Sequence, residues 1–407
     1  MKRLVCLFSS ISSDIYFRDM FLVPYYIGLK HNYSVSLVYH GKKGEKDSLY
    51  KGVQMIPLHY KGGYDCFSFL SEWYFCWYIL KNAKNIDCLV RFHFSYQTAI
   101  IGWIYKKVNP KGFFYIKGDG YGAWLALFRE KSWFKGTSKR DQKCWPVKWK
   151  NRIIRFILNK MCQLADKVSV ELPEIFECLS REKAFKERPE KLKLMFNGID
   201  ERSLYAYGIR EFDIVEKENV ILSVGRHGSW QKNTMMFLNA LSQVDLKNWK
   251  VFFIGTVETH DCLFQREIDG FFEKNPSMRE QVCFIGPIYN QKKLYEYYNK
   301  AKVFVHTALY ESYGIVLGEA FRFKNYIIST PVGIAPQLIK HGYGCLCECN
   351  NVNQLVKILQ DVIDGNVSLE QLFQQVKILN KAFSYDNEID KLGNLDRKST
   401  RLNSSHE

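Results

Sequence analysis

Short apolar runs alternate with helix-like stretches along both halves of the chain. In the first half, the runs that predict strands are "RLVCLF", "SVSLVYH", "CLVRFHF", "GFFYIKG", "KVSVEL" and "KLMFNG". In the second half, they are "NVILSVG", "KVFFIG", "VCFIG", "AKVFVHT", "NYIIST" and "GCLCE". The intervening stretches that predict helices include 232–243, 291–300, 316–323 and 351–364. This alternation is typical of the α/β class and predicts doubly wound, Rossmann-like sheets.

The length of 407 residues exceeds what one ordinary core accommodates, so two domains are expected. The polar segment 201–218 separates the two strand series, and it predicts a first domain of residues 1–200 and a second of 201–382. In each domain, ligands are expected at the carboxyl ends of the strands, which places an active site in the cleft between the two sheets. Residues 396–406, "DRKSTRLNSSH", resemble the translation of a sequencing adapter, so 396–407 is interpreted as an artefact tail.

Hydropathy and cysteine usage indicate a cytoplasmic protein. No run of apolar residues is long enough to span a bilayer, and the opening "MKRLVCLFSSISSD" fits a buried strand better than a signal peptide. The 12 cysteines follow no regular spacing, which favours reduced thiols. Cys345, Cys347 and Cys349 alternate along a predicted strand and lack nearby histidines, so a structural role is favoured over a metal site.

The positive charge is concentrated in the first half. The net charge is +16, and residues 1–200 hold 34 of the 58 Lys and Arg but only 18 of the 42 Asp and Glu. Segment 101–160 is the most basic part and also contains Trp103, Trp124, Trp133, Trp145 and Trp149. Such a surface suits anionic lipid headgroups or a nucleic-acid backbone, and an ordinary solvated face explains it equally well.

A loop in the second half carries two cations. The buried run "VILSVG" ends at Gly225, and the loop "RHGSWQKN" follows with Arg226 and Lys232 near its two ends. A guanidinium and an ammonium at the carboxyl end of a strand suit a pyrophosphate, and the glycine allows close approach to the backbone. The next helix would offer its positive amino terminus.

A second loop carries two carboxylates. In "LYESYGIVLGEAF", residues 309–321, Glu311 follows the predicted strand 301–307, and Gly314 allows a turn before a helix. Glu319 would lie about one turn into that helix. Both acids would reach a ligand whose phosphate rests on the helix amino terminus, and carboxylates accept hydrogen bonds from sugar hydroxyls.

Taken together, the two motifs resemble the donor-binding half of glycosyltransferase family 4. "SVGRHGSWQKN" and "ESYGIVLGEAF" carry the resemblance, with support from "LMFNGID" and "STPVGIAPQLIKHGYGCLCE". The likeness covers about residues 165–385. It implies a GT-B fold, two Rossmann-like domains facing across a cleft, in which 1–200 binds the acceptor and 201–382 the nucleotide-sugar donor. It also implies that 383–395 begins a helix crossing back to the first domain.

The resemblance also assigns roles within the second domain. Arg226 and Lys232 match the basic pair that binds the donor diphosphate and stabilises the leaving group, next to Gly225. Glu311 matches the first acid of the E-x7-E motif, which contacts the donor sugar, and Glu319 matches the second, which holds the ribose. Gly314, Ile315 and Val316 match positions whose backbone amides approach the phosphate.

The first half departs further from the family pattern. Its first loop, "SSISSDIYFRD", lacks the usual pair of glycines. "RFHF" and "IKGDGYG" stand where relatives carry a histidine or an acid near the acceptor, which makes His93 and Asp119 catalytic candidates and Lys117 a binding candidate. Asp119 is preferred because it ends a predicted strand between glycines. His93 lies in an apolar run, which favours a packed core histidine.

The implied reaction transfers a sugar from a UDP- or GDP-linked donor to an acceptor hydroxyl with retention, in polysaccharide or lipid-linked glycan synthesis. No Asp-x-Asp motif occurs, so metal independence and no separate cofactor are expected. The basic segment 101–160 predicts a peripheral position on the inner face of an anionic membrane. A GT-B nucleotide-sugar epimerase or hydrolase is one alternative. A nucleic-acid-binding protein is another, but it leaves both glutamates unexplained.

Overall fold

A computed structural model describes residues 1–8, 15–42, 44–59, 69–118, 147–257, 263–340, 342–376 and 382–395. The chain forms two compact units. Unit 1 comprises Met1–Phe196 together with Tyr385–Glu407, and unit 2 comprises Asn197–Ser384. Asp119, the preferred acceptor-side candidate, and the tail 396–407 lie outside the described residues.

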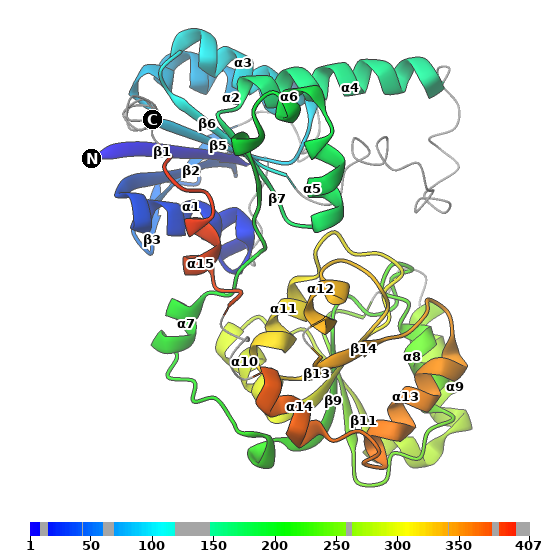
Figure 1. The fold of residues 1–407 in the computed structure, drawn as a ribbon. Helices are drawn as coiled ribbons and strands as arrows, with labels where there is room; N and C mark the ends of the chain where they lie inside the picture. Colours follow the sequence, from blue (N-terminus) through cyan, green and yellow to red (C-terminus); the bar gives the residue numbers. More distant parts are fainter. Residues whose placement is uncertain are drawn as a thin grey trace. The chain divides into compact units, whose positions relative to one another are not determined.

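Unit 1 is built on a sheet of eight described strands in the order β3-β4-β2-β1-β5-β6-β7-β8 (Figure 1). Its strands are β1 (Lys2–Phe8), β2 (Tyr33–Gly41), β3 (Ser48–Tyr50), β4 (Val53–His59), β5 (Cys88–Phe92), β6 (Phe113–Lys117), β7 (Lys167–Val170) and β8 (Leu192–Leu194). All neighbours pair in parallel except β3 and β4, which form an antiparallel hairpin at one edge. β1 lies between β2 and β5 and is buried from Leu4 to Phe8, as a strand covered on both faces must be.

Helices cover both faces of this sheet. The helices of unit 1 are α1 (Asp19–His31), α2 (Phe69–Asn82), α3 (Tyr96–Val108), α4 (Val147–Leu164), α5 (Pro173–Ser180), α6 (Lys183–Lys186) and α15 (Tyr385–Asp390), with short 3-10 turns η1 (Ile15–Phe17), η2 (Ala83–Asn85) and η3 (Pro189–Lys191). α2, α3 and α4 lie on one face, and α1 and α15 on the other (Figure 1).

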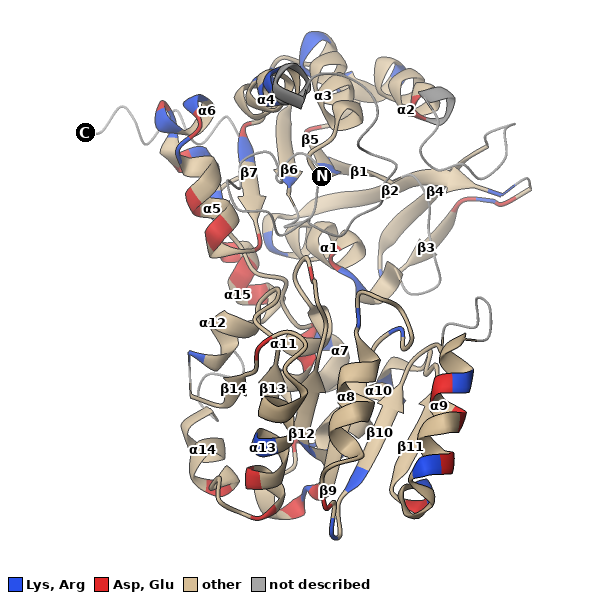
Figure 2. Ribbon diagram, turned by 90° about the vertical axis from the view of Figure 1, so that its right-hand side faces the viewer, with Lys and Arg blue, Asp and Glu red and all other residues tan. Residues whose placement is uncertain are grey.

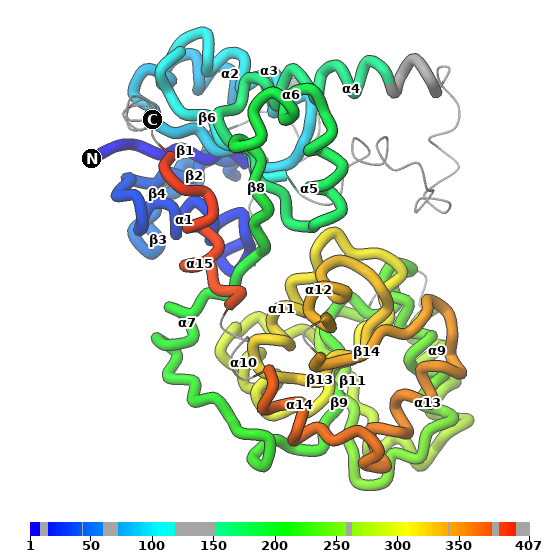
Figure 3. The backbone as a smooth tube through the Cα atoms, viewed as in Figure 1, coloured from blue at the N-terminus to red at the C-terminus, as the bar shows by residue number. Residues whose placement is uncertain are grey.

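The segment after unit 2 returns to unit 1. Tyr385, Ile389, Leu392 and Leu395 join the same buried cluster as α1 and β2, and the hydroxyl of Tyr33 donates to the carbonyl of Leu395 at 2.9 Å. Figure 3 shows this red segment beside the blue α1. Burial of these apolar side chains holds α15 on the face of the sheet that α1 also covers.

Unit 2 contains a fully parallel sheet of six described strands in the order β11-β10-β9-β12-β13-β14. Its strands are β9 (Glu218–Val224), β10 (Lys250–Ile254), β11 (Val282–Gly286), β12 (Ala301–His306), β13 (Tyr326–Ser329) and β14 (Gly344–Leu346). Its helices are α7 (Glu201–Ala206), α8 (Thr234–Leu241), α9 (Leu263–Lys274), α10 (Gln291–Lys300), α11 (Ile315–Arg322), α12 (Ala335–Ile339), α13 (Val352–Ile363) and α14 (Leu369–Val376), with 3-10 turns η4 (Ile214–Glu216) and η6 (Pro276–Glu280). Strand order changes direction between β9 and β12, so the loops after these two strands meet at the carboxyl edge of the sheet.

Every apolar run that predicted a strand overlaps one, although "KLMFNG" shares only two residues with β8. The strand in the run "CLVRFHF" is shorter than expected, because β5 ends at Phe92. Ser95 caps α3 by accepting from the backbone N–H of Thr98 at 3.1 Å, so the chain must turn first, and it does so at His93 with φ of 66°. The interpretation of His93 as a packed core residue is therefore wrong, since its side chain is exposed.

Candidate active site in the second unit

The first functional loop leads from β9 to α8 and is anchored on both sides. The His227 side chain is buried beneath it, and its Nε2 lies 3.1 Å from the carbonyl oxygen of Ile254 on β10. Burial lowers the pKa of His227 to about 4, so the neutral ring donates this hydrogen bond at neutral pH. Arg226 is exposed beside it, with an Nη2 contact of 3.4 Å to the Gln231 side chain.

Lys232 closes the same loop, and its stem passes over Gly225. A Cβ at Gly225 would lie 3.3 Å from Cε of Lys232, so the absence of a side chain there lets the lysine lie against the strand end. The predicted pair of cations is thus placed at the carboxyl end of β9, with Arg226 open to solvent and Lys232 partly buried.

The second functional loop leads from β12 to α11 and is hydrogen-bonded to the first. The N–H of Leu309 donates to the carbonyl of Gln231 at 2.8 Å, and Nε2 of Gln231 donates to the carbonyl of Tyr310 at 2.9 Å. Thr307 donates through Oγ1 to the carbonyl of Asn233 at 3.1 Å. The two loops therefore form one layer over the ends of β9 and β12, which pair in the sheet.

Glu311 joins the two loops electrostatically. Its Oε1 forms an ion pair with Nζ of Lys232 and lies 3.1 Å from Nε2 of His306, the last residue of β12. Burial alone would raise the pKa of Glu311, but the hydrogen bond from His306 and the charge of Lys232 outweigh it and lower the pKa to about 2. Burial lowers the pKa of His306, so its ring is neutral and donates to an ionised carboxylate at neutral pH.

Glu319 lies in a different environment on α11. It is buried, and its carboxylate accepts from the hydroxyl of Tyr298 at 2.9 Å and from Nε2 of Gln291 at 3.1 Å, both on α10. Burial raises the pKa of Glu319 to about 7, although the two hydrogen bonds act in the opposite direction. The two acids of the motif therefore differ in pKa, so at neutral pH Glu311 is fully ionised and Glu319 only partly so.

The amino terminus of α11 starts at Gly314, which adopts φ of 83° as the residue before the first helical turn. Ile315 and Val316 form that turn and are half-buried. The first backbone N–H groups of a helix lack intrahelical acceptors, so this turn presents donors and a partial positive charge next to the Glu311 loop.

A third loop, between β13 and α12, contacts the second loop. Gly333 has φ of 53°, and a Cβ there would lie 2.2 Å from the carbonyl oxygen of Tyr313 and 3.1 Å from Cβ of Glu311. The N–H of Ile334 donates to the same Tyr313 carbonyl at 2.8 Å. Gly333 thus lets the third loop come close enough to support the position of Glu311.

We expect Gly333→Ala to lower the free energy of unfolding of unit 2 by about 2 kcal/mol or more, because the backbone at residues 311–313 must shift to admit the methyl group. Gly208→Ala is the matched control: its φ is also positive, at 65°, but no atom lies within 4 Å of the added Cβ. The control should cost only about 1 kcal/mol of backbone strain. Urea denaturation measures both, and equal losses would show that the close approach to Glu311 is unimportant.

Among the sequence-predicted residues of unit 1, Lys117 ends β6 and is fully buried. Its Nζ lies 3.3 Å from Glu171 and 3.9 Å from Asp19, which starts α1. His93 is exposed on the loop after β5, at the same carboxyl edge of the sheet, and its backbone N–H donates to the carbonyl of Lys117 at 2.9 Å. A backbone hydrogen bond thus joins the two candidates at the ends of the paired strands β5 and β6, although the ammonium group of Lys117 already pairs with carboxylates.

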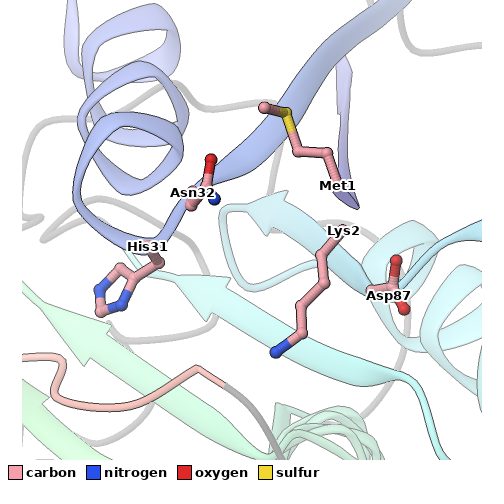
Figure 4. A pocket seen from close by; sticks show the side chains of 5 residues that line it. All are labelled: Met1, Lys2, His31, Asn32 and Asp87. Carbon is pink, nitrogen blue, oxygen red and sulfur yellow. The ribbon is translucent and has the colours of Figure 1, made fainter.

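Other features do not add to the site. In the described ranges, no group of three or more His, Cys, Asp or Glu side chains is placed to hold a metal ion. A surface hollow is lined by Met1, Lys2, His31, Asn32 and Asp87 (Figure 4), but it lies at the amino end of β1, whereas Lys117 lies at the carboxyl end of β6 in the same sheet. No described helix is both long and apolar enough to cross a membrane.

Sequence reasoning missed the residues that hold the two glutamates. His306 was included in a predicted strand, and its position five residues before Glu311 on a strand end was an available signal. Tyr298 and Gln291, the partners of Glu319, lie in a predicted helix and carry no signal of their own, because nothing local to α10 shows that it packs against α11.

Comparison with known proteins finds similarity in the part of the chain that carries these loops. Residues 209–377 match the model of the family described as "Glycosyl transferases group 1". The chain is 25% identical over 187 residues to the N-acetyl-alpha-D-glucosaminyl L-malate synthase of Bacillus anthracis, a match that covers 43% of this chain and 46% of that protein. The chain thus spans about half the length of this curated relative.

Two solved structures resemble the whole chain. Sucrose-phosphate synthase from Thermosynechococcus elongatus superposes with a TM-score of 0.68 at 16% identity, covering 99% of this chain and 100% of that one. Anabaena Alr3699/HepE in complex with UDP superposes with a TM-score of 0.63 at 12% identity and the same coverage. The predicted fold is therefore confirmed: the protein has a GT-B fold, and residues 209–377 match the group 1 glycosyl transferases.

Proposed function

We propose that the protein is a retaining glycosyltransferase that moves a sugar from a UDP- or GDP-linked donor to an acceptor hydroxyl. The observation that carries the proposal is the ionised Glu311, which Lys232 and His306 hold at the carboxyl edge of β9 and β12. The match of residues 209–377 to group 1 glycosyl transferases supports it, as does the likeness in fold to a protein solved with UDP.

The diphosphate of the donor would bind between the positively charged groups at the carboxyl ends of β9 and β12. Arg226 is exposed and carries a guanidinium suited to two phosphate oxygens, while Lys232 and the first turn of α11 supply an ammonium and backbone N–H donors. Negative charge grows on the departing diphosphate as the bond to the sugar breaks. Positive groups fixed in place before the reaction stabilise that charge, and this is the basis for proposing metal-independent transfer.

The carboxylates would hold the two ends of the donor. Glu311 is ionised and partly exposed, so it can accept hydrogen bonds from sugar hydroxyls while it remains paired with Lys232. Glu319 would accept from the ribose hydroxyls, from a position one helical turn after Gly314. On the side of unit 1, we retain His93 as an acceptor-side candidate because it is exposed at the carboxyl edge of its sheet.

Nucleotide binding provides the direct test. UDP- or GDP-sugars at about a hundredfold excess over their dissociation constant should raise the melting temperature of unit 2 by roughly 5–10 °C. The shift should persist in EDTA and should shrink in Lys232→Ala but not in Lys250→Ala, since Lys250 is exposed at the amino end of β10. The absence of a shift with UDP-, GDP- and ADP-sugars would contradict the donor site.

The acceptor belongs, in this proposal, to cell-surface polysaccharide or lipid-linked glycan synthesis on the cytoplasmic side of a membrane. A radiolabelled donor incubated with and without a lipid-linked acceptor separates transfer from other chemistry. Label that moves into the lipid fraction supports transfer. Free sugar or an epimerised donor formed equally well without acceptor would instead identify a hydrolase or an epimerase.

A further inference from the structure

The outer surface of α2, α3 and α4 carries a repeated pairing of an aromatic ring with a lysine. The three helices pack side by side on one face of the unit 1 sheet, with α3 between the other two (Figures 1 and 2). On each helix an exposed ring is followed four residues later by a lysine. The pairs, called here the aromatic–lysine face, are Trp77–Lys81, Trp103–Lys107 and Phe156–Lys160.

Each lysine lies over the ring of its own helix. The ammonium nitrogen is 4.7 Å from the ring centre of Trp77 for Lys81, and 5.9 Å from that of Trp103 for Lys107. In the third pair, Lys160 lies 5.8 Å from the ring centre of Phe156. The same geometry thus recurs on three helices that pack side by side.

These rings are not needed to fill the core. The inner faces of the helices are already packed, for example by Phe75 and Ile79 of α2, which are fully buried. In contrast, Trp77, Trp103 and Phe156 are 55%, 53% and 62% exposed. Exposed rings on three adjacent helices indicate a binding face rather than isolated surface residues.

Negative charge is almost absent from the three helices. Their sequences contain one Lys or Arg in α2, two in α3 and five in α4, but only one acid, Glu72 of α2. Glu72 is buried and lies 3.8 Å from Arg91. Within the described residues, Lys81, Lys107 and Lys160 have no carboxylate partner, so the aromatic–lysine face is cationic.

We propose that the aromatic–lysine face binds an anionic lipid bilayer. Aromatic rings settle at the level of the headgroups, and lysines beside them extend their ammonium groups to lipid phosphates. A second copy of the chain is disfavoured, because two cationic faces would repel each other. A nucleic-acid strand is disfavoured because an ammonium group lies over each ring on which a base would stack.

This surface differs from the one that the sequence predicted. Segment 101–160 supplies two of the three pairs, but α2 supplies the third. Trp124, Trp133 and Trp145 lie outside the described residues, and the side chain of Trp149 is also not described. Lipid binding by this face does not depend on the donor chemistry; only its purpose, access to a lipid-linked acceptor, rests on the proposed function.

Sedimentation of the full chain with lipid vesicles tests the inference. We expect the protein to sediment at low salt with phosphatidylglycerol vesicles and to remain in solution with phosphatidylcholine vesicles. The triple variant Trp77→Ser, Trp103→Ser and Phe156→Ser should partition about tenfold less. The triple variant Lys81→Gln, Lys107→Gln and Lys160→Gln should lose a similar factor and most of its salt dependence.

The matched control changes three exposed apolar residues of unit 2, Tyr205→Ser, Val215→Ser and Leu263→Ser, and should bind vesicles as the unaltered protein does. Equal partition between anionic and neutral vesicles would overturn the inference. So would unchanged binding of the aromatic triple variant, or a dimer in solution that this variant breaks while no vesicle binding is seen. The nucleotide-induced rise in melting temperature should persist in every variant, so failure here is distinct from failure of the donor site.

Discussion

Replacing Glu311 by Gln should slow sugar transfer by about 100-fold or more while leaving nucleotide affinity nearly unchanged. The substitution keeps the size of the side chain but removes a negative charge that is fully developed near neutral pH, since the pKa of Glu311 is lowered to about 2. Lys232 then loses its partner and retains its full positive charge for the diphosphate. The loss should therefore fall on kcat rather than on nucleotide binding.

Steady-state transfer assays measure kcat, and nucleotide titration measures affinity, so together they show which of the two is lowered. Glu296→Gln serves as the control, because Glu296 is an exposed acid on α10. If Glu311→Gln weakened nucleotide binding as much as transfer, Glu311 would be acting through the phosphate site. Unchanged transfer would remove Glu311 from the mechanism.

The strands of both sheets could be predicted because buried parallel strands are continuous apolar runs. β3, which has only three residues, and β4, whose pattern Pro57 interrupts, both escaped prediction. The structure tolerates this proline because it lies beyond the three residue pairs that β3 makes with β4. His93 shows the opposite error, since an apolar run continues past the point where the cap of α3 forces a turn.

The cations and carboxylates of the site could be named from sequence, but their partners could not. Lys232 and Glu311 are 79 residues apart, and they meet because β9 and β12 are neighbours in the sheet. Strand order is a non-local property that apolar runs do not encode. For the same reason, the sequence does not reveal that Glu319 is buried. Its burial depends on α10 packing against α11 and not on the E-x7-E spacing.

The buried Glu319 should make the stability of unit 2 fall as pH rises toward neutral. Burial raises its folded-state pKa to about 7, against about 4.3 in an unfolded chain, so the folded protein binds the proton more tightly. This contribution is fully present below about pH 4 and is lost as pH rises through about 7, for a total of roughly 4 kcal/mol. Glu319→Gln cannot titrate, so its stability relative to the unaltered protein should increase by that amount between these limits.

Urea denaturation of both proteins across this pH range isolates the effect, because the histidines they share cancel in the difference. Tyr298→Phe provides an internal check. It removes a hydrogen bond that favours the ionised carboxylate, so it should move the midpoint of the pH dependence upward. A constant difference between the two proteins at all pH values would mean that the pKa of Glu319 is the same in the folded and unfolded chain.

A carboxylate kept in a position that destabilises the fold at neutral pH calls for a functional reason, and the proposed ribose binding would supply one. Glu319→Gln should weaken nucleotide binding by about tenfold or more, because a hydrogen bond to a charged acceptor becomes a neutral one. In the unaltered protein, nucleotide affinity should increase as pH rises through about 7, whereas in Glu319→Gln it should stay flat. If calorimetric titration finds full affinity in Glu319→Gln, the ribose lies elsewhere, and the buried acid serves only to join α11 to α10.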